Sequence, residues 1–386
     1  ADSSTFRFME HKKLNVLTVV GTRPEIIRLS RVMSLLDDHV NHIIAHTGQN
    51  YDYELNEIFY QDLELRKPDF FLNVDVSSLE ASVGDIIRKS GELLRQEKPD
   101  ALLVLGDTNS CLSAYMAKRL HIPIFHMEAG NRCFDFNVPE EINRRIIDHI
   151  ADFNLVYTEY ARRHLISEGL PHRRIYLTGS PMNEVLNYYK PKIASSGILE
   201  TLELREGEYF IVSVHREENV DNPGNLKKIL AILNQLAEKY RLPVIVSTHP
   251  RTRKRLESAP DLKMDDRIRF LKPFGFTDYL HLQICAKCAI SDSGTISEES
   301  AILNFPAISL RNSMERPEAQ DAGTIILTGF DADCVLNSIE TECDDHKRRK
   351  SKQIPIDYQV NDTSWRVLKL IQGLALLSNK WHGLNL

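Results

Sequence analysis

The chain has 386 residues and a formal net charge of −6, with 48 basic residues against 54 acidic ones. Without an excess of positive charge, a general nucleic-acid binder is excluded, because nothing would attract the phosphate backbone. No apolar run reaches the roughly 18 residues that span a bilayer, and the first residues lack the apolar core of a secretory signal. We therefore expect a cytoplasmic protein that contacts no membrane.

The first residues and the cysteines allow two further predictions, about the N-terminal tail and about disulfides. Residues 1–8 are typical of a vector-derived or loose tail, with Met9 as the candidate natural start. Six cysteines in a chain of this length suit a reducing compartment, so disulfides are not expected. Cys285 and Cys288 form one CxxC, but without a second pair or histidines at zinc spacing. Buried structural thiols are therefore favoured over a metal or redox role.

Short apolar strands alternate with amphipathic helices along the chain, which predicts βαβ units and parallel sheets. The strands expected in the first half are residues 14–20, 42–46, 101–105, 123–125, 153–157 and 174–178. The helices expected between them include residues 25–36, 110–120 and 141–150. Pro24 supports the first helix, because proline is favoured at the first helical turn.

The alternation pauses at residues 188–196, which contain Pro191 and are expected to form a linker. A second series of strands is expected at residues 209–214, 243–248, 268–271, 289–291, 307–310 and 324–327. This organisation predicts one doubly wound domain at 12–188 and another at 197–360, with a last helix at about 364–378 packing back on the first. Two such domains facing each other would form an interdomain cleft that suits a nucleotide-linked ligand.

Acidic residues follow two of the expected strands and open the next helix. Asp107 and Glu128 come after buried strand patterns, and ligands bind beyond the carboxyl ends of parallel strands. Glu140 and Arg144 are four residues apart and share one helix face. Carboxylates gathered in one cleft repel one another and raise at least one pKa, which provides an acid and a base near neutral pH. The alternative, that Asp107 and Glu140 only cap helices, stays open.

The turn at residues 21–25 follows the first strand and opens a helix. Its glycine permits close approach of the backbone, while the helix N-terminus and Arg23 favour an anion such as a diphosphate. Arg28 would add a second positive charge near the same helix end. An ordinary strand-to-helix turn is the alternative. The pattern is neither a Walker loop nor GxGxxG, so neither ATP nor NAD is inferred.

A second group of polar residues ends strands in the second half. His215 follows one strand, and Ser293, Gly294 and Thr295 follow another and open a helix that carries Glu299. The turn offers a second cradle for an anion, and the carboxylate suits ribose hydroxyls. Their shared placement at strand ends favours a phosphate-sugar ligand over a purely structural role.

Seven ordered motifs resemble the non-hydrolysing UDP-N-acetylglucosamine 2-epimerases, over nearly all of residues 12–377. They are GTRPE at 21–25, HTGQNYD at 46–52, GDT at 106–108, HMEAG at 126–130, PEEINRR at 139–145, HREEN at 215–219 and DSGTISEE at 292–299. The resemblance implies an α/β fold of the glycosyltransferase-B type, with two Rossmann-like domains closing on a UDP-sugar. It also implies inversion at C2 without an added redox cofactor, and relatives commonly form homodimers. No metal site is expected.

The loop before the paired glutamates departs from the usual family pattern. It is two residues shorter, and residues 130–145 resemble the branch that makes UDP-N-acetyl-L-fucosamine from UDP-2-acetamido-2,6-dideoxy-L-talose for capsule or O-antigen. The UDP-N-acetylglucosamine and UDP-N-acetylmannosamine pair is the alternative substrate. A UDP-sugar-dependent glycosyltransferase and a non-catalytic UDP-sugar sensor are alternatives of other classes, since fold alone does not fix function. Gln49 alone does not establish an allosteric site.

The resemblance also implies a mechanism and the residues that perform it. UDP leaves C1 while a base removes the C2 proton, and proton return to the other face of the resulting 2-acetamidoglycal precedes re-addition of UDP. The implied catalytic group is Asp107, Glu128, Glu140, Arg144 and His215. Asp107 and Glu128 are expected to be the acid and base on opposite faces of C2. The residues expected to bind UDP are Arg23, Arg28, His215, Ser293, Gly294, Thr295 and Glu299.

Overall fold

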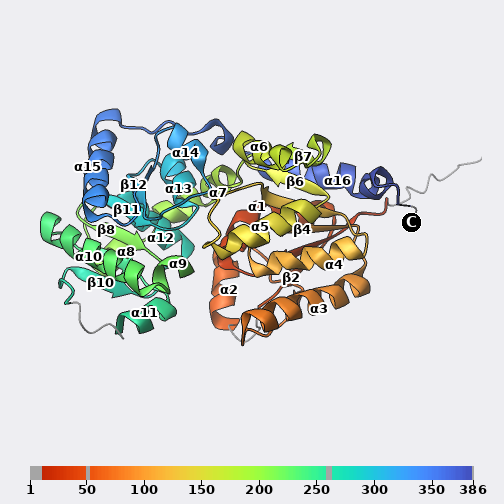
Figure 1. Cartoon of the computed structure of the whole chain (residues 1–386), viewed down its shortest axis with the longest axis horizontal. Helices are drawn as coiled ribbons and strands as arrows, with labels where there is room; N and C mark the ends of the chain where they lie inside the picture. Colours follow the sequence, from red (N-terminus) through yellow and green to blue (C-terminus); the bar gives the residue numbers. More distant parts are fainter. Residues whose placement is uncertain (1–10, 49–52, 258–262, 385–386) are drawn as a thin grey trace, which may run out of the picture. The chain divides into compact units, whose positions relative to one another are not determined.

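The computed structural model describes residues 11–48, 53–257 and 263–384 (Figure 1). The expected tail at 1–8, Gln49 and the end of the HTGQNYD motif lie outside the described residues. The chain divides into two compact units. Unit 1 contains the described residues up to Met127, then Ile147–Leu155 and the chain from Ser364; unit 2 contains Glu128–Ile146 and Val156–Thr363. In the described part of the chain, no helix is long and apolar enough to cross a membrane.

A seven-stranded sheet has the order β3-β2-β1-β4-β5-β6-β7. Its strands are β1 Asn15–Val20, β2 Asn41–His46, β3 Phe70–Phe71, β4 Ala101–Leu105, β5 Ile124–Ala129, β6 Phe153–Val156 and β7 Ile175–Leu177. The central pairs β1 with β2, β1 with β4 and β4 with β5 are parallel, as expected. β3 was not predicted, because two residues are too short to show a period.

One expected strand is longer in the structure. β5 continues to Ala129 because its parallel ladder with β4 still pairs Leu105 with Met127. Glu128 therefore lies inside the end of the strand rather than after it, which corrects the expected strand of 123–125. The helices of this part are α1 Arg23–His39, α2 Tyr53–Asp62, α3 Leu79–Glu97, η1 Asn109–Leu112, α4 Ser113–Arg119, α5 Pro139–Ile150, α6 Glu159–Ser167 and η2 His172–Arg174.

A six-stranded sheet in unit 2 has the order β10-β9-β8-β11-β12-β13, and all its pairs are parallel. Its strands are β8 Phe210–Ser213, β9 Val244–Ser247, β10 Ile268–Leu271, β11 Cys288–Ser291, β12 Ala307–Ser309 and β13 Ile326–Leu327. The remaining helices are α7 Met182–Ala194, α8 Ile198–Leu202, α9 Glu217–Val220, α10 Pro223–Tyr240, α11 Pro250–Glu257, α12 Phe276–Cys285, α13 Ile296–Leu303, α14 Pro317–Asp321, α15 Ala332–Arg349, η3 Ile356–Tyr358 and α16 Thr363–Trp381.

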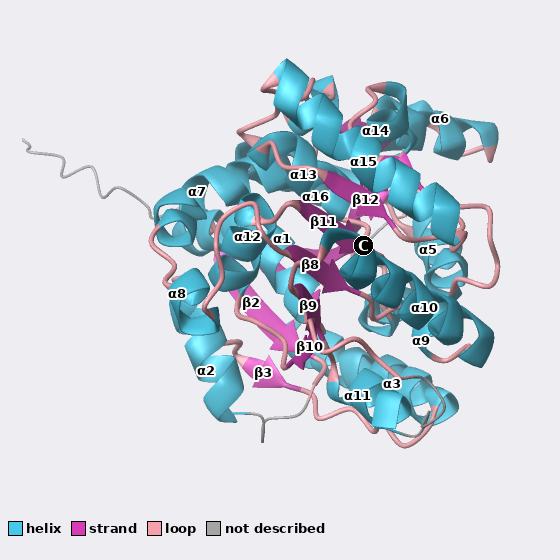
Figure 2. Cartoon of the chain, turned by 90° about the vertical axis from the view of Figure 1, so that its left-hand side faces the viewer, coloured by secondary structure: helices cyan, strands magenta, loops and turns pink. Residues whose placement is uncertain are grey.

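Apolar residues cover both faces of the six-stranded sheet, as expected for parallel strands. Phe210 and Val212 of β8 point into one core with residues of α10 and α15. Ile211, between them, points into a second core with residues of α12 and α13. Figure 2 shows the strands as one layer with α10 and α12 on either side. The two cores fix the sheet, so the loops at its carboxyl edge are held in place.

The expected linker at 188–196 is helical for most of its length. α7 continues to Ala194 with Pro191 inside it. Pro191 lies in the last turn and lacks an N–H, so only one helical hydrogen bond is lost before the helix ends. The proline was misread as the start of a loop. At the other end of the chain, α16 contacts elements of unit 1, where Trp365 packs edge-on against His39.

Candidate active site

The first strand-to-helix turn of unit 1 is filled by its own glutamate. One carboxylate oxygen of Glu25 accepts hydrogen bonds from the backbone amides of Gly21 at 2.9 Å and Thr22 at 2.6 Å. The Thr108 hydroxyl donates to the other oxygen at 2.7 Å. Glu25 is buried, and burial raises the pKa of its carboxyl. These two amides are therefore engaged inside the protein, which the sequence pattern of an anion cradle did not reveal.

Gly21 is required by packing. A Cβ at this position would lie 1.9 Å from the Ser110 hydroxyl oxygen and 2.7 Å from that of Thr47. The two hydroxyls are themselves hydrogen-bonded at 2.7 Å. Glycine is therefore needed here because neighbouring loops of unit 1 pack closely, whether or not the turn also contacts a ligand.

Of the three predicted site residues of unit 1, Asp107 lies in the loop after β4, and Arg23 and Arg28 lie on α1. Asp107 is half-buried and lies two residues after the end of β4. The N-cap of η1 is Thr108, so Asp107 does not hold the capping position that was left open as an alternative. Arg23 is exposed at the start of α1, where its guanidinium covers the Phe59 ring. Arg28 is half-buried on the same helix.

Glu128 has an unusual backbone in unit 2. Its φ is +59°, in the left-handed region that costs a non-glycine residue about 1–3 kcal/mol. Its carboxylate is buried and lies 3.7 Å from the Arg316 guanidinium, which also lies 3.4 Å from Glu298. Burial alone would lower the pKa of Arg316, but Glu298 and Glu128 hold it well above its ordinary value. The ion pair fixes the direction of the Glu128 side chain.

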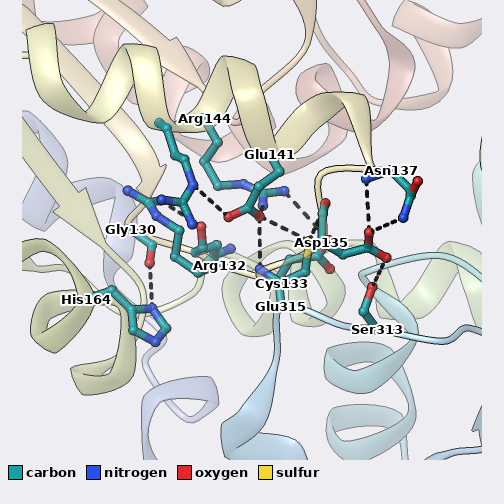
Figure 3. A network of polar contacts seen from close by, with 12 residues as sticks. Gly130, Arg132, Cys133, Asp135, Asn137, Glu141, Arg144, His164, Ser313 and Glu315 are labelled. Carbon is teal, nitrogen blue, oxygen red and sulfur yellow. Dashed lines mark hydrogen bonds and ion pairs between the residues drawn. The ribbon is translucent and has the colours of Figure 1, made fainter. Parts of the chain in front are cut away.

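Helix α5, which carries the predicted residues Glu140 and Arg144, is hydrogen-bonded through Glu141 to the loop before it (Figure 3). Oε2 of Glu141 accepts hydrogen bonds from the Cys133 amide at 2.9 Å, the Cys133 thiol at 3.0 Å and the Arg144 guanidinium at 2.9 Å. Glu141 is fully buried. Burial alone would raise its pKa, but these donors hold it below the ordinary value. Glu141 was not singled out from the sequence, because the family resemblance assigned the catalytic role to its neighbour Glu140.

Three arginines from different parts of unit 2 surround the Glu315 carboxylate. Arg311 binds both its carboxylate oxygens at 2.7 and 3.0 Å. Arg144 of α5 lies 3.7 Å away and Arg216 lies 4.0 Å away. Burial would raise the pKa of Glu315, but the charges of Arg216, Arg311 and Arg144 hold it well below its ordinary value. This buried cluster links α5 to the loop after β8, and the sequence reasoning missed it.

Asp292 ties together the two loops at the carboxyl ends of β8 and β11. Its carboxylate accepts hydrogen bonds from the backbone amides of His215 and Arg216 and from the Asn219 side chain, at 2.9–3.1 Å to Oδ2. The Arg216 guanidinium also donates to the Asp292 carbonyl at 2.7 Å. Because Asp292 is fully buried, these contacts lock the HREEN motif against the DSGT motif.

The remaining predicted residues lie at this locked edge. The His215 imidazole is half exposed and its Nδ1 shares a hydrogen bond with the Ser213 hydroxyl at 3.0 Å. The Ser293 and Thr295 hydroxyls are 3.0 Å apart. A Cβ at Gly294 would meet only the Arg216 and Glu315 side chains, at 3.6 and 3.9 Å. The protein therefore leaves space beside the Gly294 backbone.

The structure thus assigns the predicted residues to two groups. Within unit 2, contacts connect Glu128 through Arg316 to α13, which carries Glu299. Other contacts connect Arg144 through Glu315 and Arg216 to the loop with His215, which Asp292 joins to the loop with Ser293, Gly294 and Thr295. Glu140 belongs to the same group, since its charge acts on Arg216. Arg23, Arg28 and Asp107 belong to unit 1. Among the described residues, no three His, Cys, Asp or Glu side chains could hold a metal ion.

Comparison with known proteins decides the family. The sequence profile described as UDP-N-acetylglucosamine 2-epimerase matches residues 35–372. The chain belongs to the UDP-N-acetylglucosamine 2-epimerase family. A solved structure of UDP-N-acetylglucosamine 2-epimerase from Rickettsia bellii is 50% identical to this epimerase, with a TM-score of 0.90 over 95% of this chain and 98% of that chain.

Two further relatives show the same likeness at lower sequence identity. The UDP-GlcNAc 2-epimerase of Methanocaldococcus jannaschii, solved with UDP-GlcNAc and UDP, is 32% identical with a TM-score of 0.86, covering 93% of this chain and 99% of that one. A UDP-2,3-diacetamido-2,3-dideoxy-D-glucuronate 2-epimerase of Pseudomonas aeruginosa is 32% identical over 333 residues, which cover 85% of this chain and 92% of the relative.

The family result confirms the expected class of fold and of reaction. The two parallel α/β sheets match the glycosyltransferase-B type structures of the family. The protein is an isomerase that acts on sugar nucleotides, a UDP-sugar 2-epimerase. The two alternatives of other classes, a glycosyltransferase and a non-catalytic sensor, are set aside.

Proposed function

We propose that the protein interconverts UDP-2-acetamido-2,6-dideoxy-L-talose and UDP-N-acetyl-L-fucosamine. The observation that carries this choice of substrate is the loop from Gly130 to Val138, whose sequence GNRCFDFNV resembles that branch of the family. In the structure the loop carries two exposed aromatic rings, Phe134 and Phe136, at 67% and 66% exposure. An apolar surface suits the C6 methyl group of a 6-deoxy sugar better than a hydroxymethyl group, because a buried hydroxyl needs a partner.

Contacts with other parts of unit 2 hold the loop in place from Gly130 to Asp135, as a specificity element requires. Glu141 binds the amide and thiol of Cys133, and Arg132 pairs with Glu168 at 2.7 Å. Further along, the Ser313 hydroxyl donates to Asp135 at 3.2 Å. Gly130 packs so closely against Ala161 that a Cβ at this position would lie 2.5 Å from the Ala161 carbonyl oxygen. The exposed rings therefore project from a fixed backbone.

The proposed reaction moves one proton and one leaving group. A base removes the C2 proton as the bond between C1 and the diphosphate oxygen breaks, so UDP leaves with the electron pair and C1 and C2 become a double bond. An acid then protonates C2 from the other face, and the diphosphate oxygen re-forms its bond to C1. We assign acid and base to Asp107 and Glu128, one on each face of C2. Both types of side chain transfer protons in enzymes.

The remaining roles follow from charge and position. Arg144, fixed between Glu141 and Glu315, sets the electrostatic environment of the acidic residues, and Glu140 supports one of them. His215 donates to the departing diphosphate from its exposed ring. Donors held in place before the reaction stabilise developing charge with little reorganisation. The proposed UDP-binding residues are Arg23, Arg28, His215, Ser293, Gly294, Thr295 and Glu299.

The mechanism is tested by solvent exchange. Turnover in deuterium oxide should place one deuterium at C2 of the product, which proton NMR detects directly. Product that keeps its original C2 hydrogen contradicts the proposal. Asp107→Asn and Glu128→Gln should each lower kcat about 10²- to 10⁴-fold, the usual contribution of a general acid or base. Circular dichroism should show both variants folded.

The substrate is tested separately, with both epimer pairs supplied to the same enzyme preparation. The 6-deoxy pair should have the higher kcat/KM, and Phe134→Ala or Phe136→Ala should reduce that preference more than it reduces kcat/KM for the other pair. One methyl group in an apolar contact is worth about 1–3 kcal/mol, or roughly 10- to 200-fold. Tyr115→Ala, which removes another exposed aromatic ring, is the matched control.

The second candidate is the UDP-N-acetylglucosamine and UDP-N-acetylmannosamine pair. The names of several relatives, including the Rickettsia bellii structure, favour it. A higher kcat/KM for this pair, unaffected by the two phenylalanine substitutions, would establish it and overturn the first choice while leaving the epimerase reaction intact.

A further inference from the structure

Two thiols meet in unit 2 at a distance from the chemistry proposed above. Cys288 begins β11 and is completely buried, while Cys343 lies in α15 and is partly exposed. α15 packs against β11, and both side chains belong to the same apolar core. The Cys343 thiol donates a hydrogen bond at 3.5 Å to the carbonyl oxygen of Lys287, the residue next to Cys288, and the Cys288 side chain also acts on Cys343 as a hydrogen-bond donor. The two sulfur atoms are therefore neighbours, although they are far apart in the sequence.

The CxxC motif itself does not supply this pair. Cys285, the motif partner of Cys288, lies in the core on the opposite face of the sheet. Its sulfur is 3.7 Å from Nε2 of His281. All six cysteines are free thiols in the structure. The pair that can react is therefore Cys288 with Cys343.

We propose that Cys343 and Cys288 are an oxidisable pair in which hydrogen peroxide oxidises Cys343 and Cys288 then closes a disulfide. In the first step the Cys343 sulfur attacks one peroxide oxygen, so an S–O bond forms, the O–O bond breaks and water leaves after protonation. In the second step the Cys288 sulfur attacks the oxidised Cys343, so an S–S bond forms and the S–O bond breaks. The Cys288 proton leaves with that oxygen as a second water.

The surroundings divide the two roles. The hydrogen bond from Cys288, helped by the charges of Lys287 and Lys347, lowers the pKa of Cys343 against its partial burial and the nearby Glu342. The Cys343 thiol also lies 3.5 Å from the Lys287 carbonyl oxygen. Cys288 donates the shared hydrogen bond and is buried, so its pKa is raised well above the ordinary value. The other titratable groups that act on the pair are Tyr240 and Lys352.

The difference in exposure and pKa between the two thiols suits oxidation by peroxide. The thiolate is the nucleophile, and a partly exposed cysteine with a lowered pKa is the form that peroxide reaches. A buried thiol in contact with it is protected from peroxide but placed to attack the oxidised sulfur. Cys334 provides an internal control, because it is exposed on the same helix α15 but lies about 13 Å along the helix axis from Cys343.

The test uses the full chain and hydrogen peroxide. After treatment, denaturation and alkylation, mass spectrometry of the digested protein should show a peptide cross-linked through Cys288 and Cys343, reversed by dithiothreitol. Cys334→Ser should leave this cross-link unchanged. Cys343→Ser should abolish it and leave Cys288 reduced. Oxidation of Cys334 with both Cys343 and Cys288 still reduced would overturn the proposal.

Two substitutions of Cys288 separate its roles. Both Cys288→Ala and Cys288→Ser should leave Cys343 as a sulfenic acid that dimedone traps. Only the alanine variant removes the hydrogen-bond donor, so the pH midpoint of its Cys343 oxidation rate should be higher than in the serine variant, which retains a donor. Equal midpoints in the two variants, with no trapped sulfenic acid in either, would contradict the assigned roles.

Discussion

The two units each bury a glutamate at a strand-end loop, but in opposite surroundings. Glu25 of unit 1 is held by neutral donors, the amides of Gly21 and Thr22 and the Thr108 hydroxyl. Glu315 of unit 2 is held by arginines. Burial raises the pKa of Glu25, whereas the arginine charges overcome burial and hold the pKa of Glu315 well below its ordinary value. The same side chain thus closes a turn in one unit and binds a charged cluster in the other.

This difference matters for where an anion can bind. In unit 1 the glutamate occupies amides at the helix start, so an anion there depends on side chains such as Arg23 and Arg28. In unit 2 the carboxylate of Asp292 takes amides from the neighbouring loop and leaves the Gly294 turn with space beside it. The proposed diphosphate contact therefore rests more on backbone in unit 2 and more on side chains in unit 1.

Removing the charge of Glu315 should produce the largest effect on stability. Glu315→Gln leaves three arginines facing an uncharged amide, and breaking a buried ion pair in this way costs about 3–5 kcal/mol. Urea unfolding at neutral pH measures the loss. Glu208→Gln, at an exposed glutamate, is the control and should change stability by less than about 0.5 kcal/mol. An equally small change for Glu315→Gln would show that the cluster contributes nothing to folding.

The two turns should also differ in their need for glycine. Gly21→Ala forces a Cβ into the Ser110 and Thr47 hydroxyls, and overpacking of this kind costs about 1–3 kcal/mol. Gly294→Ala has room in the protein, so its stability should stay within about 0.5 kcal/mol. If the turn of unit 2 approaches the diphosphate, KM should rise for Gly294→Ala. If Gly21→Ala left the free energy of unfolding unchanged, the two turns would not differ in their packing.

The pH dependence of stability gives the smallest and most specific test. Because the pKa of Glu25 is raised in the folded protein, its contribution to stability is present below its ordinary pKa of 4.5 and is lost as pH rises. Glu25→Gln should therefore gain on the wild type as pH increases from about 4 to 7.

Glu315 should show the opposite sign. Because its folded pKa is lowered, its contribution is present above 4.5 and is lost as pH falls further. The deficit of Glu315→Gln should therefore shrink in acid. Thermal unfolding of both variants from about pH 2 to pH 7 measures the two effects. Slopes of the same sign would contradict the comparison between the two glutamates.

Much of the fold could be predicted from local patterns. Twelve expected strands correspond to twelve of the observed ones, with β4 and β10 at the expected ends. Buried parallel strands are short apolar runs bounded by turns, and this signal is local. The misses had local causes too: β3 is too short to show a period, Pro191 looked like a helix end, and the ladder that extends β5 depends on its neighbour β4.

The sequence by itself determined the strand and helix order, the motifs of the family and the chemical types at the strand ends. Only the tertiary structure decided the partners of the buried charges and thiols. Glu25 closing its own turn, Glu315 among three arginines, and Cys343 against Cys288 each depend on elements that meet through folding. The periodicity of a sequence shows which face of a helix or strand is buried. It does not show which residues of other elements pack against that face, so these pairings can be seen only in the folded structure.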